Sequence, residues 1–156
     1  MIFVTLGTQD YPFDRLLRAL DEIEEELVVQ GGASTHRPDG AEWLGFVPAP
    51  QIVENVRRAR VVISHAGVGS VLTVVGEGKR PVVVPRLQRF GEVVDDHQLP
   101  FARRAAEAGL VTLVEDVSRL PGVVATTPPP PEILRAQETL VDDLGSYLRE
   151  VLGYSR

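Results

Sequence analysis

The sequence has no cysteine, and it has only one methionine and one tryptophan among its 156 residues. Because cysteine is absent, disulfide bonds, thiolate zinc sites and cysteine nucleophiles are excluded, and the fold has to rest on packing alone. This composition is compatible with a reducing, cytoplasmic environment.

Long apolar segments are also absent. No apolar run approaches the ~20 residues that span a bilayer. The apolar start at residues 1–6 has no basic leader and breaks at Gly7, so it predicts a buried first strand instead of a signal peptide. We expect a cytoplasmic chain that reaches a membrane only through a partner.

Clustered positive charge is lacking too. The net charge is −6, and the 16 Lys and Arg residues are scattered or paired. Nucleic-acid binding needs clustered cations to neutralise phosphates, so no nucleic-acid partner is expected. With three histidines and no H-x-x-x-H pattern, a histidine-based metal site has little support, although Asp95-Asp96 offers carboxylates to a cation.

What is present is a regular alternation of strand and helix patterns. Apolar, β-branched runs indicate strands, and these lie at residues 2–6, 28–32, 43–47, 60–63, 81–85 and 110–114. Helical spacing of apolar residues indicates helices, and these lie at residues 14–29, 48–56, 71–77 and 96–108. The alternation predicts a doubly wound, mainly parallel α/β sheet of the Rossmann-like type.

Composition divides the chain into three parts. Residues 1–125 are predicted to form one α/β domain. Residues 126–132 include four consecutive prolines, which favour an extended spacer. Residues 133–153 carry an apolar stripe at helical spacing and are predicted to form an amphipathic helix, which packs either on its own domain or on a partner chain.

Two glycine-containing loops follow strands, at the edge where open α/β sheets bind ligands. In Gly7-Thr8, the glycine permits a tight turn, and the hydroxyl and nearby amides can donate to phosphate. In His65-Ala66-Gly67-Val68-Gly69-Ser70, the amides and the serine hydroxyl face an anion at a helix N-terminus. The chain has neither a G-x-G-x-x-G after the first strand nor a Gly-Lys-Ser/Thr, so hydride transfer and P-loop chemistry are not expected.

The histidines near this edge have more than one interpretation. His65 is a catalytic base, a hydrogen-bond donor to phosphate or sugar, or a residue that caps its loop. Asp95 or Asp96 is expected to cap the following helix, which leaves His97 and Gln98 at its first turn, where they can contact sugar hydroxyls.

Three cations flank the apolar strand at residues 81–85. Arg86, Arg89 and Lys79 either neutralise phosphate charge or belong to a solvated surface loop.

Four sequence segments, in this order and spacing, carry a resemblance to a known family. They are residues 3–8 (FVTLGT), 63–70 (ISHAGVGS), 79–86 (KRPVVVPR) and 90–98 (FGEVVDDHQ). Together they resemble the C-terminal domain of glycosyltransferase family 28 over about residues 1–125. The chain is most similar to the small nucleotide-sugar-binding subunits of two-component transferases, which act in dolichol-linked N-acetylglucosamine addition and in bacterial exopolysaccharide and capsule assembly.

The resemblance implies one half of a GT-B transferase, in which two Rossmann-like halves close over a UDP-sugar. The other half would be a membrane-anchored subunit that brings a polyprenyl-diphosphate-linked saccharide, and the reaction would be an inverting transfer without a catalytic metal or other cofactor. The implied nucleotide-sugar site consists of Gly7, Thr8, Phe46, Val47, His65, Ala66, Gly67, Gly69, Ser70, Thr73, Arg86, His97 and Gln98. In it the glycine loops hold the diphosphate, Phe46-Val47 contacts uracil through its backbone, and His97-Gln98 reads the donor sugar.

One position departs from the family pattern. Related sequences commonly carry Glu or Asp three residues after the motif serine, where a carboxylate holds ribose hydroxyls, whereas this chain has Thr73. A hydroxyl is a weaker partner than a charged acceptor, and Glu77 replaces it only if the helix is suitably oriented. The catalytic base is not assigned, and Asp95 and His97 are the local candidates.

The leading hypothesis is therefore the donor-binding subunit of a two-component glycosyltransferase. The alternative is a non-catalytic accessory protein that enhances a membrane-anchored partner transferase, which Thr73 and the proline-tethered helix motivate. A stand-alone hydrolase or epimerase acting on nucleotide sugars is disfavoured, because 156 residues leave no room for a second domain that closes the cleft.

Overall fold

The computed structural model describes residues 1–128. Six strands form one sheet, and they are β1 (Ile2–Thr5), β2 (Leu27–Gln30), β3 (Glu42–Leu44), β4 (Val61–His65), β5 (Val82–Val84) and β6 (Thr112–Leu113). Their order is β3-β2-β1-β4-β5-β6, and every neighbouring pair is parallel. The doubly wound, parallel, Rossmann-like α/β fold is thereby confirmed, with the reversal of strand order between β1 and β4.

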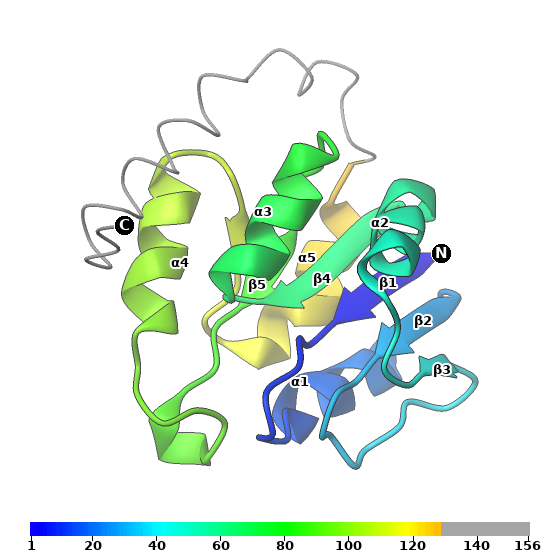
Figure 1. The fold of residues 1–156 in the computed structure, drawn as a ribbon, viewed down its shortest axis with the longest axis horizontal. Helices are drawn as coiled ribbons and strands as arrows, with labels where there is room; N and C mark the ends of the chain where they lie inside the picture. The colour runs from blue at the N-terminus through cyan, green and yellow to red at the C-terminus, as the bar shows by residue number, and fades with distance from the viewer. Residues whose placement is uncertain (129–156) are drawn as a thin grey trace.

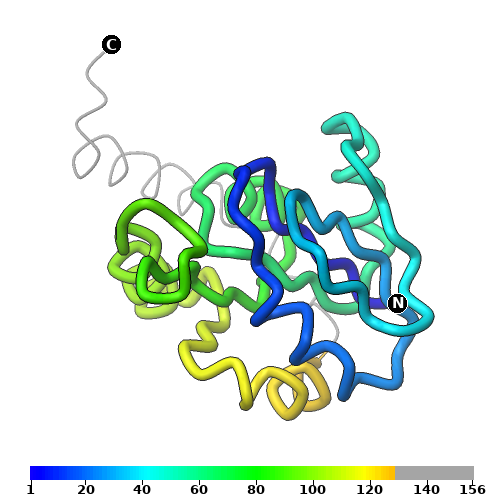
Figure 2. Tube along the Cα trace, turned by 90° about the horizontal axis from the view of Figure 1, so that it is seen from below, coloured from blue at the N-terminus to red at the C-terminus, as the bar shows by residue number. Residues whose placement is uncertain are grey.

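Helices cover both faces of this sheet (Figure 1). They are α1 (Asp14–Ala19), α2 (Ala49–Arg58), α3 (Val68–Gly76), α4 (Gln98–Glu107) and α5 (Leu120–Thr126), with short 3-10 turns η1 (Leu20–Glu22), η2 (Gln88–Phe90) and η3 (Val117–Arg119). Helices α2, α3 and α4 lie on the near face in Figure 1, and α1 and α5 lie behind the sheet. Figure 2 shows the two layers apart, with α5 at the bottom and α2 at the upper right.

Side chains of each strand alternate between these two helical layers. Ile2 and Val4 of β1 belong to the buried cluster that includes the apolar residues of α1 and α5. Phe3, between them, belongs to a separate cluster with Val56 of α2 and Val74 of α3. Since both faces of the inner strands are covered, β1, β2, β4 and β5 are mainly apolar instead of alternating with polar residues, whereas the edge strand β3 carries the exposed Glu42.

The prediction of the first helix was wrong in extent. The helix predicted over residues 14–29 ends at Ala19 and continues only as a 3-10 turn to Glu22. Leu27, which matched the helical spacing, instead pairs with Ile2 in the sheet and is buried there. Tertiary pairing therefore outweighed the local periodicity.

Helix α5 was not predicted. It is only seven residues long, and the 3-10 turn before it is capped by the Asp116 carboxylate, which accepts a hydrogen bond from the Ser118 amide at 3.0 Å. Thr126, the first residue of the predicted spacer, is the last residue of this helix.

The rest of the predicted spacer beyond Pro128, and the amphipathic helix predicted over residues 133–153, lie outside the described residues. Within residues 1–128, no helix has the length and apolar character needed to cross a membrane.

Candidate nucleotide-binding cleft

A cleft of about 410 Å³ lies at the carboxyl ends of β1, β2 and β4, beside the start of α3. Its lining consists of Thr5, Gly7, Thr8, Gln9, Gln30, Phe46, Val47, Ala49, Ile52, Val53, His65, Gly67, Gly69, Ser70, Thr73 and Val74. This is the edge of the sheet, next to the reversal of strand order, where α/β folds bind ligands. The volume falls in the range of small-molecule sites.

The two glycine loops meet in this cleft with the imidazole of His65 between them. A Cβ added at Gly7 would lie 2.6 Å from the His65 Cε1, and one added at Gly67 would overlap the Nε2 of the same ring. Gly7 also has a φ of 72°, which other residues rarely adopt. Both glycines are therefore required by the packing of one side chain, independently of any ligand.

His65 is held neutral in this position. Its side chain lies at the end of β4, and the residue is 6% exposed. Burial, followed by the positive charge of Arg86, lowers the pKa of His65 to about 4, while the Thr5 carbonyl acts in the opposite direction. Its Nδ1 is buried without a partner among the described residues. A buried neutral ring that fills the space between two loops positions them, and it is not set up as a general base at neutral pH.

A buried polar chain fixes the first loop from the side of β2. The Thr5 hydroxyl donates to the Gln30 Oε1 at 2.9 Å, and the Gln30 Nε2 donates to the Gly7 carbonyl at 3.0 Å. Both side chains are only 4% exposed, and both line the cleft. Neither residue was predicted from sequence to belong to the site. The available signal was a polar residue at the end of each of two otherwise apolar strands.

The second loop is already helical. Helix α3 begins at Val68, three residues before the predicted start, and Gly67 is its N-cap without a side-chain hydrogen bond. The first-turn amides of Val68, Gly69 and Ser70 therefore have no side-chain cap, and the N-terminal end of a helix favours an anion. A Cβ at Gly69 would meet no atom within 4 Å, so the backbone is open on that side.

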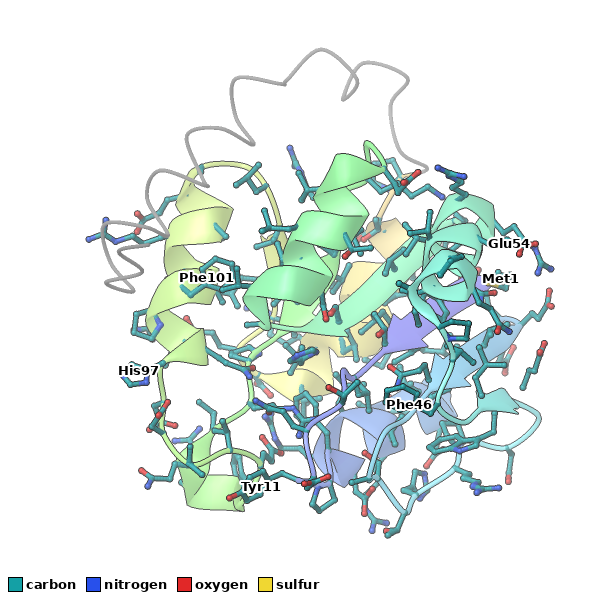
Figure 3. All side chains as sticks on the ribbon, in the orientation of Figure 1. Met1, Tyr11, Phe46, Glu54, His97 and Phe101 are labelled. Carbon is teal, nitrogen blue, oxygen red and sulfur yellow. The ribbon has the colours of Figure 1, made fainter. Side chains whose placement is uncertain are left out.

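Phe46 and Val47 close the cleft on the side of α2. They follow β3, and Phe46 is 86% exposed; Figure 3 shows it in the lower right part of the molecule. An exposed aromatic ring beside a cleft is suited to packing against a base or a partner chain.

Thr73 lines the cleft as predicted, but its hydroxyl is engaged. It donates to the Gly69 carbonyl at 2.9 Å, within the same helix. Glu77 does not replace a carboxylate here, because it is the C-cap at the far end of α3 and pairs with Arg57 at 2.6 Å. With His65 neutral, none of the side chains of residues 1–128 that line the cleft carries a charge.

Four residues of the predicted site do not line the cleft. Ala66 is buried in the cluster between α3 and α4. Arg86 is 1% exposed, and its guanidinium donates to backbone carbonyls of the chain itself. Figure 3 shows His97 at the edge of the molecule, away from Phe46, and Gln98 accepts a hydrogen bond from the Arg86 amide at 3.2 Å.

The capping prediction for α4 was also wrong. His97 is the N-cap, with no side-chain cap bond. Asp96 instead accepts from the Gln88 amide at 2.7 Å, and Asp95 pairs with His97 Nδ1 at 2.6 Å on the surface. The loop thus uses both carboxylates for its own turns.

The remaining predicted cations lie elsewhere. Lys79 precedes β5, so it lies at the amino ends of the strands, opposite the cleft. There its Nζ donates to the carbonyls of Arg57 and Ala59 at the end of α2. Arg89 is exposed on η2 and stacks on Phe90. Among the described residues, no group of three or more His, Asp or Glu residues is arranged to hold a metal ion.

Comparison with protein families gives one match over most of the chain. The family model described as glycosyltransferase family 28 C-terminal domain matches residues 1–139.

Two curated relatives share the name UDP-N-acetylglucosamine transferase subunit ALG13. The protein of Yarrowia lipolytica is 41% identical over 68 residues, which cover 43% of this chain and 33% of the relative. The protein of Homo sapiens is 31% identical over 123 residues, which cover 69% of this chain and 10% of the relative. The chain thus matches a third or less of the length of these relatives.

Solved structures with the same architecture are glycosyltransferases of low sequence identity. Spinosyn rhamnosyltransferase SpnG has a TM-score of 0.60 at 20% identity, over 97% of this chain and 44% of that one. MurG of Acinetobacter baumannii has a TM-score of 0.54 at 19% identity, over 94% of this chain and 44% of that one. At these identities the likeness shows the fold, which corresponds to one half of a GT-B glycosyltransferase.

Proposed function

The chain belongs to the glycosyltransferase family 28 C-terminal domain family, and on this basis we propose that it is the UDP-sugar-binding subunit of a two-component inverting glycosyltransferase. The relatives named as UDP-N-acetylglucosamine transferase subunits support the two-component arrangement.

The observation that carries the proposal is the convergence of two glycine loops on one uncharged cleft. The uncapped first turn of α3 supplies amide donors, Ser70 and Thr8 supply hydroxyls, and the Gly7 turn lies opposite. Amide and hydroxyl donors at a helix N-terminus are suited to a diphosphate. In the transfer step, the bond from the anomeric carbon to the diphosphate breaks, and these donors stabilise the negative charge that develops on the leaving UDP.

Among residues 1–128, no side chain of the cleft is placed as a general base, and this supports a catalytic contribution from a partner. His65 is the only titratable side chain that lines it among the described residues; its pKa of about 4 makes the imidazole a weak base, and only 6% of the residue is exposed. Asp95 and His97, the local candidates from sequence, lie outside the cleft. In this proposal, the group that takes the proton of the attacking hydroxyl belongs to the second subunit.

That subunit, in this proposal, is membrane-anchored and presents a polyprenyl-diphosphate-linked saccharide during exopolysaccharide, capsule or glycan assembly. The chain described here would then work in the cytoplasm, at the membrane surface, through that partner. No catalytic metal is required, since the amides of α3 and the hydroxyls beside them supply the stabilisation of the leaving group.

Calorimetric titration with UDP, UDP-N-acetylglucosamine and UDP-glucose tests the donor site directly. Binding of at least one of them by the chain, alone or with its membrane partner, is expected, and sugar transfer is expected only with the partner present. An absence of binding to every uridine nucleotide under both conditions would refute the proposal.

The alternative, a non-catalytic enhancer of a partner transferase, is favoured by one observation. The Thr73 hydroxyl donates to the Gly69 carbonyl, and no carboxylate of the described part of the chain lines the cleft in its place. Reconstituted transfer separates the two functions. Loss of transfer in Gly69→Ala supports donor binding, whereas full transfer in Gly69→Ala together with loss on deleting residues 132–156 supports the accessory role.

A further inference from the structure

The loop between β1 and α1 is held from outside the cleft by one buried cation. Arg86 follows β5 and is 1% exposed. Its Nη2 donates to the Leu6 carbonyl at 2.9 Å, and its Nη1 donates to the Tyr11 carbonyl at 2.9 Å. These two carbonyls flank residues 7–10, so the single guanidinium of Arg86 forms hydrogen bonds at both ends of that short segment.

The segment between the two carbonyls is part of the cleft wall. Gly7, Thr8 and Gln9 line the cleft, and Gly7 packs against the His65 ring. A shift of the segment changes where its amides and the Thr8 hydroxyl point. The position of Arg86 therefore affects ligand binding through the backbone that this side chain holds.

The guanidinium itself is oriented by two further groups. It stacks over the Phe13 ring at 4.7 Å, and its Nη1 also donates to the Glu92 carbonyl at 3.1 Å. Burial lowers the pKa of Arg86 to about 10, with the charge of Glu92 acting in the opposite direction, so the side chain stays charged at neutral pH.

The Glu92 carboxylate does not pair with Arg86. It accepts from Nε and Nη2 of Arg15 at 2.8 and 2.9 Å and from the Leu87 amide at 3.0 Å. Arg15 joins α1 to the loop after β5 in this way, and none of its hydrogen bonds reaches residues 7–10. The two arginines thus share one network, but only Arg86 bonds to the backbone that flanks the cleft segment.

We infer that Arg86 is a positioning residue for donor binding: it fixes the Gly7–Gln9 wall of the cleft relative to the first turn of α3, so that both loops reach the same diphosphate. This inference rests on the proposed function. It assigns Arg86 a role without ligand contact, in place of the direct phosphate contact expected from sequence.

Arg86→Lys tests this role, because lysine keeps the charge but loses the planar fork that serves two carbonyls at once. Arg15→Lys is the matched control in the same network. We expect Arg86→Lys to raise the Kd for UDP about tenfold or more, since small misplacements of binding groups have effects of this size. The Kd for uridine, which has no phosphate, is expected to change less than about threefold, and the amide NMR signals of residues 7–10 are expected to shift.

Arg15→Lys is expected to lower the urea midpoint while leaving the Kd for UDP within about threefold of wild type, as for a change confined to stability. The inference is overturned if folded Arg86→Lys binds UDP like wild type, or if both variants weaken UDP and uridine equally.

If Arg86→Lys does not fold, Phe13→Leu, which removes the ring stacked on the guanidinium, takes its place with the same readouts. A folded Phe13→Leu chain with an unchanged Kd for UDP and unshifted amides at residues 7–10 also overturns the inference. Failure of the wild-type chain to bind any uridine nucleotide would instead refute the proposed function.

Discussion

Replacing Gly67 by alanine should destabilise the chain through a single steric conflict. The added Cβ would lie 2.9 Å from Cδ2 and from Cε1 of His65 and closer still to Nε2. The ring is 6% exposed, and Gly7 borders it on the other side, so it has little room to move. Since the φ of Gly67 is −76°, alanine adds no backbone strain, and the loss is that of overpacking, about 1–3 kcal/mol.

Gly69→Ala is the matched control two residues further on. Its Cβ meets nothing within 4 Å, and the position is inside α3, where alanine is favoured over glycine by up to about 1 kcal/mol. Gly69→Ala is therefore expected to be as stable as wild type or more so. Because Gly69 lines the cleft, the added methyl group is expected to weaken UDP binding about tenfold by keeping the phosphate from the amides.

Urea denaturation of both variants, and of His65→Ala with and without Gly67→Ala, measures these effects. Removal of the ring should relieve the conflict, so the double variant is expected to be more stable than the sum of the single changes by at least about 1 kcal/mol. A Gly67→Ala chain as stable as wild type, or a double variant that is simply additive, would show that the glycine is not there to accommodate the ring.

Three further changes have defined outcomes. His65 is protonated near pH 6.5 in the unfolded chain but only near pH 4 in the folded chain, so its contribution to stability is full above about pH 6.5 and should fall by up to about 3 kcal/mol as the pH drops toward 4. Urea titrations of wild type and His65→Gln across this pH range isolate the loss, and equal pH profiles of the two chains contradict it. Thr73→Glu should tighten uridine binding about three- to tenfold, because it adds a charged acceptor for ribose hydroxyls. In the same calorimetric titration 2′,3′-dideoxyuridine, which lacks those hydroxyls, should show no gain, and an equal gain for both nucleosides rules out the ribose contact. Glu77→Gln should lower stability by less than about 1 kcal/mol and leave UDP binding unchanged, since Glu77 lies at the far end of α3 and its partner, Arg57 of α2, is largely exposed. Weaker UDP binding would place this end of α3 in the site.

The inner strands were predictable because helices cover both of their faces, which requires mainly apolar residues. Val61–Ile63 and Val82–Val84 lie between two helical layers, and such continuous apolar runs have few alternatives in a chain of this length. Helix ends were predicted less well. Leu27 fits both a helical period and a strand, and only its pairing with Ile2 decides between them.

The cleft was predictable as far as it depends on neighbours in sequence. Gly7-Thr8 and the segment from Gly67 to Ser70 lie at the ends of strands that are adjacent in the sheet, so both loops line the cleft as expected. The same local reasoning failed for Arg86, His97 and Gln98, which follow β5, one strand further from the reversal of strand order.

The sequence by itself determined the alternation of strands and helices along the chain, and it placed the two glycine loops at the carboxyl ends of strands. Both are local signals, because they depend on periodicity and on glycine. The tertiary structure decided what the polar residues do. Arg86 bonds to carbonyls of a loop 75 to 80 positions away, and His65 loses its charge through burial between Gly7 and Gly67. Burial and long-range hydrogen bonds set these roles, and both depend on which distant segments the fold brings together.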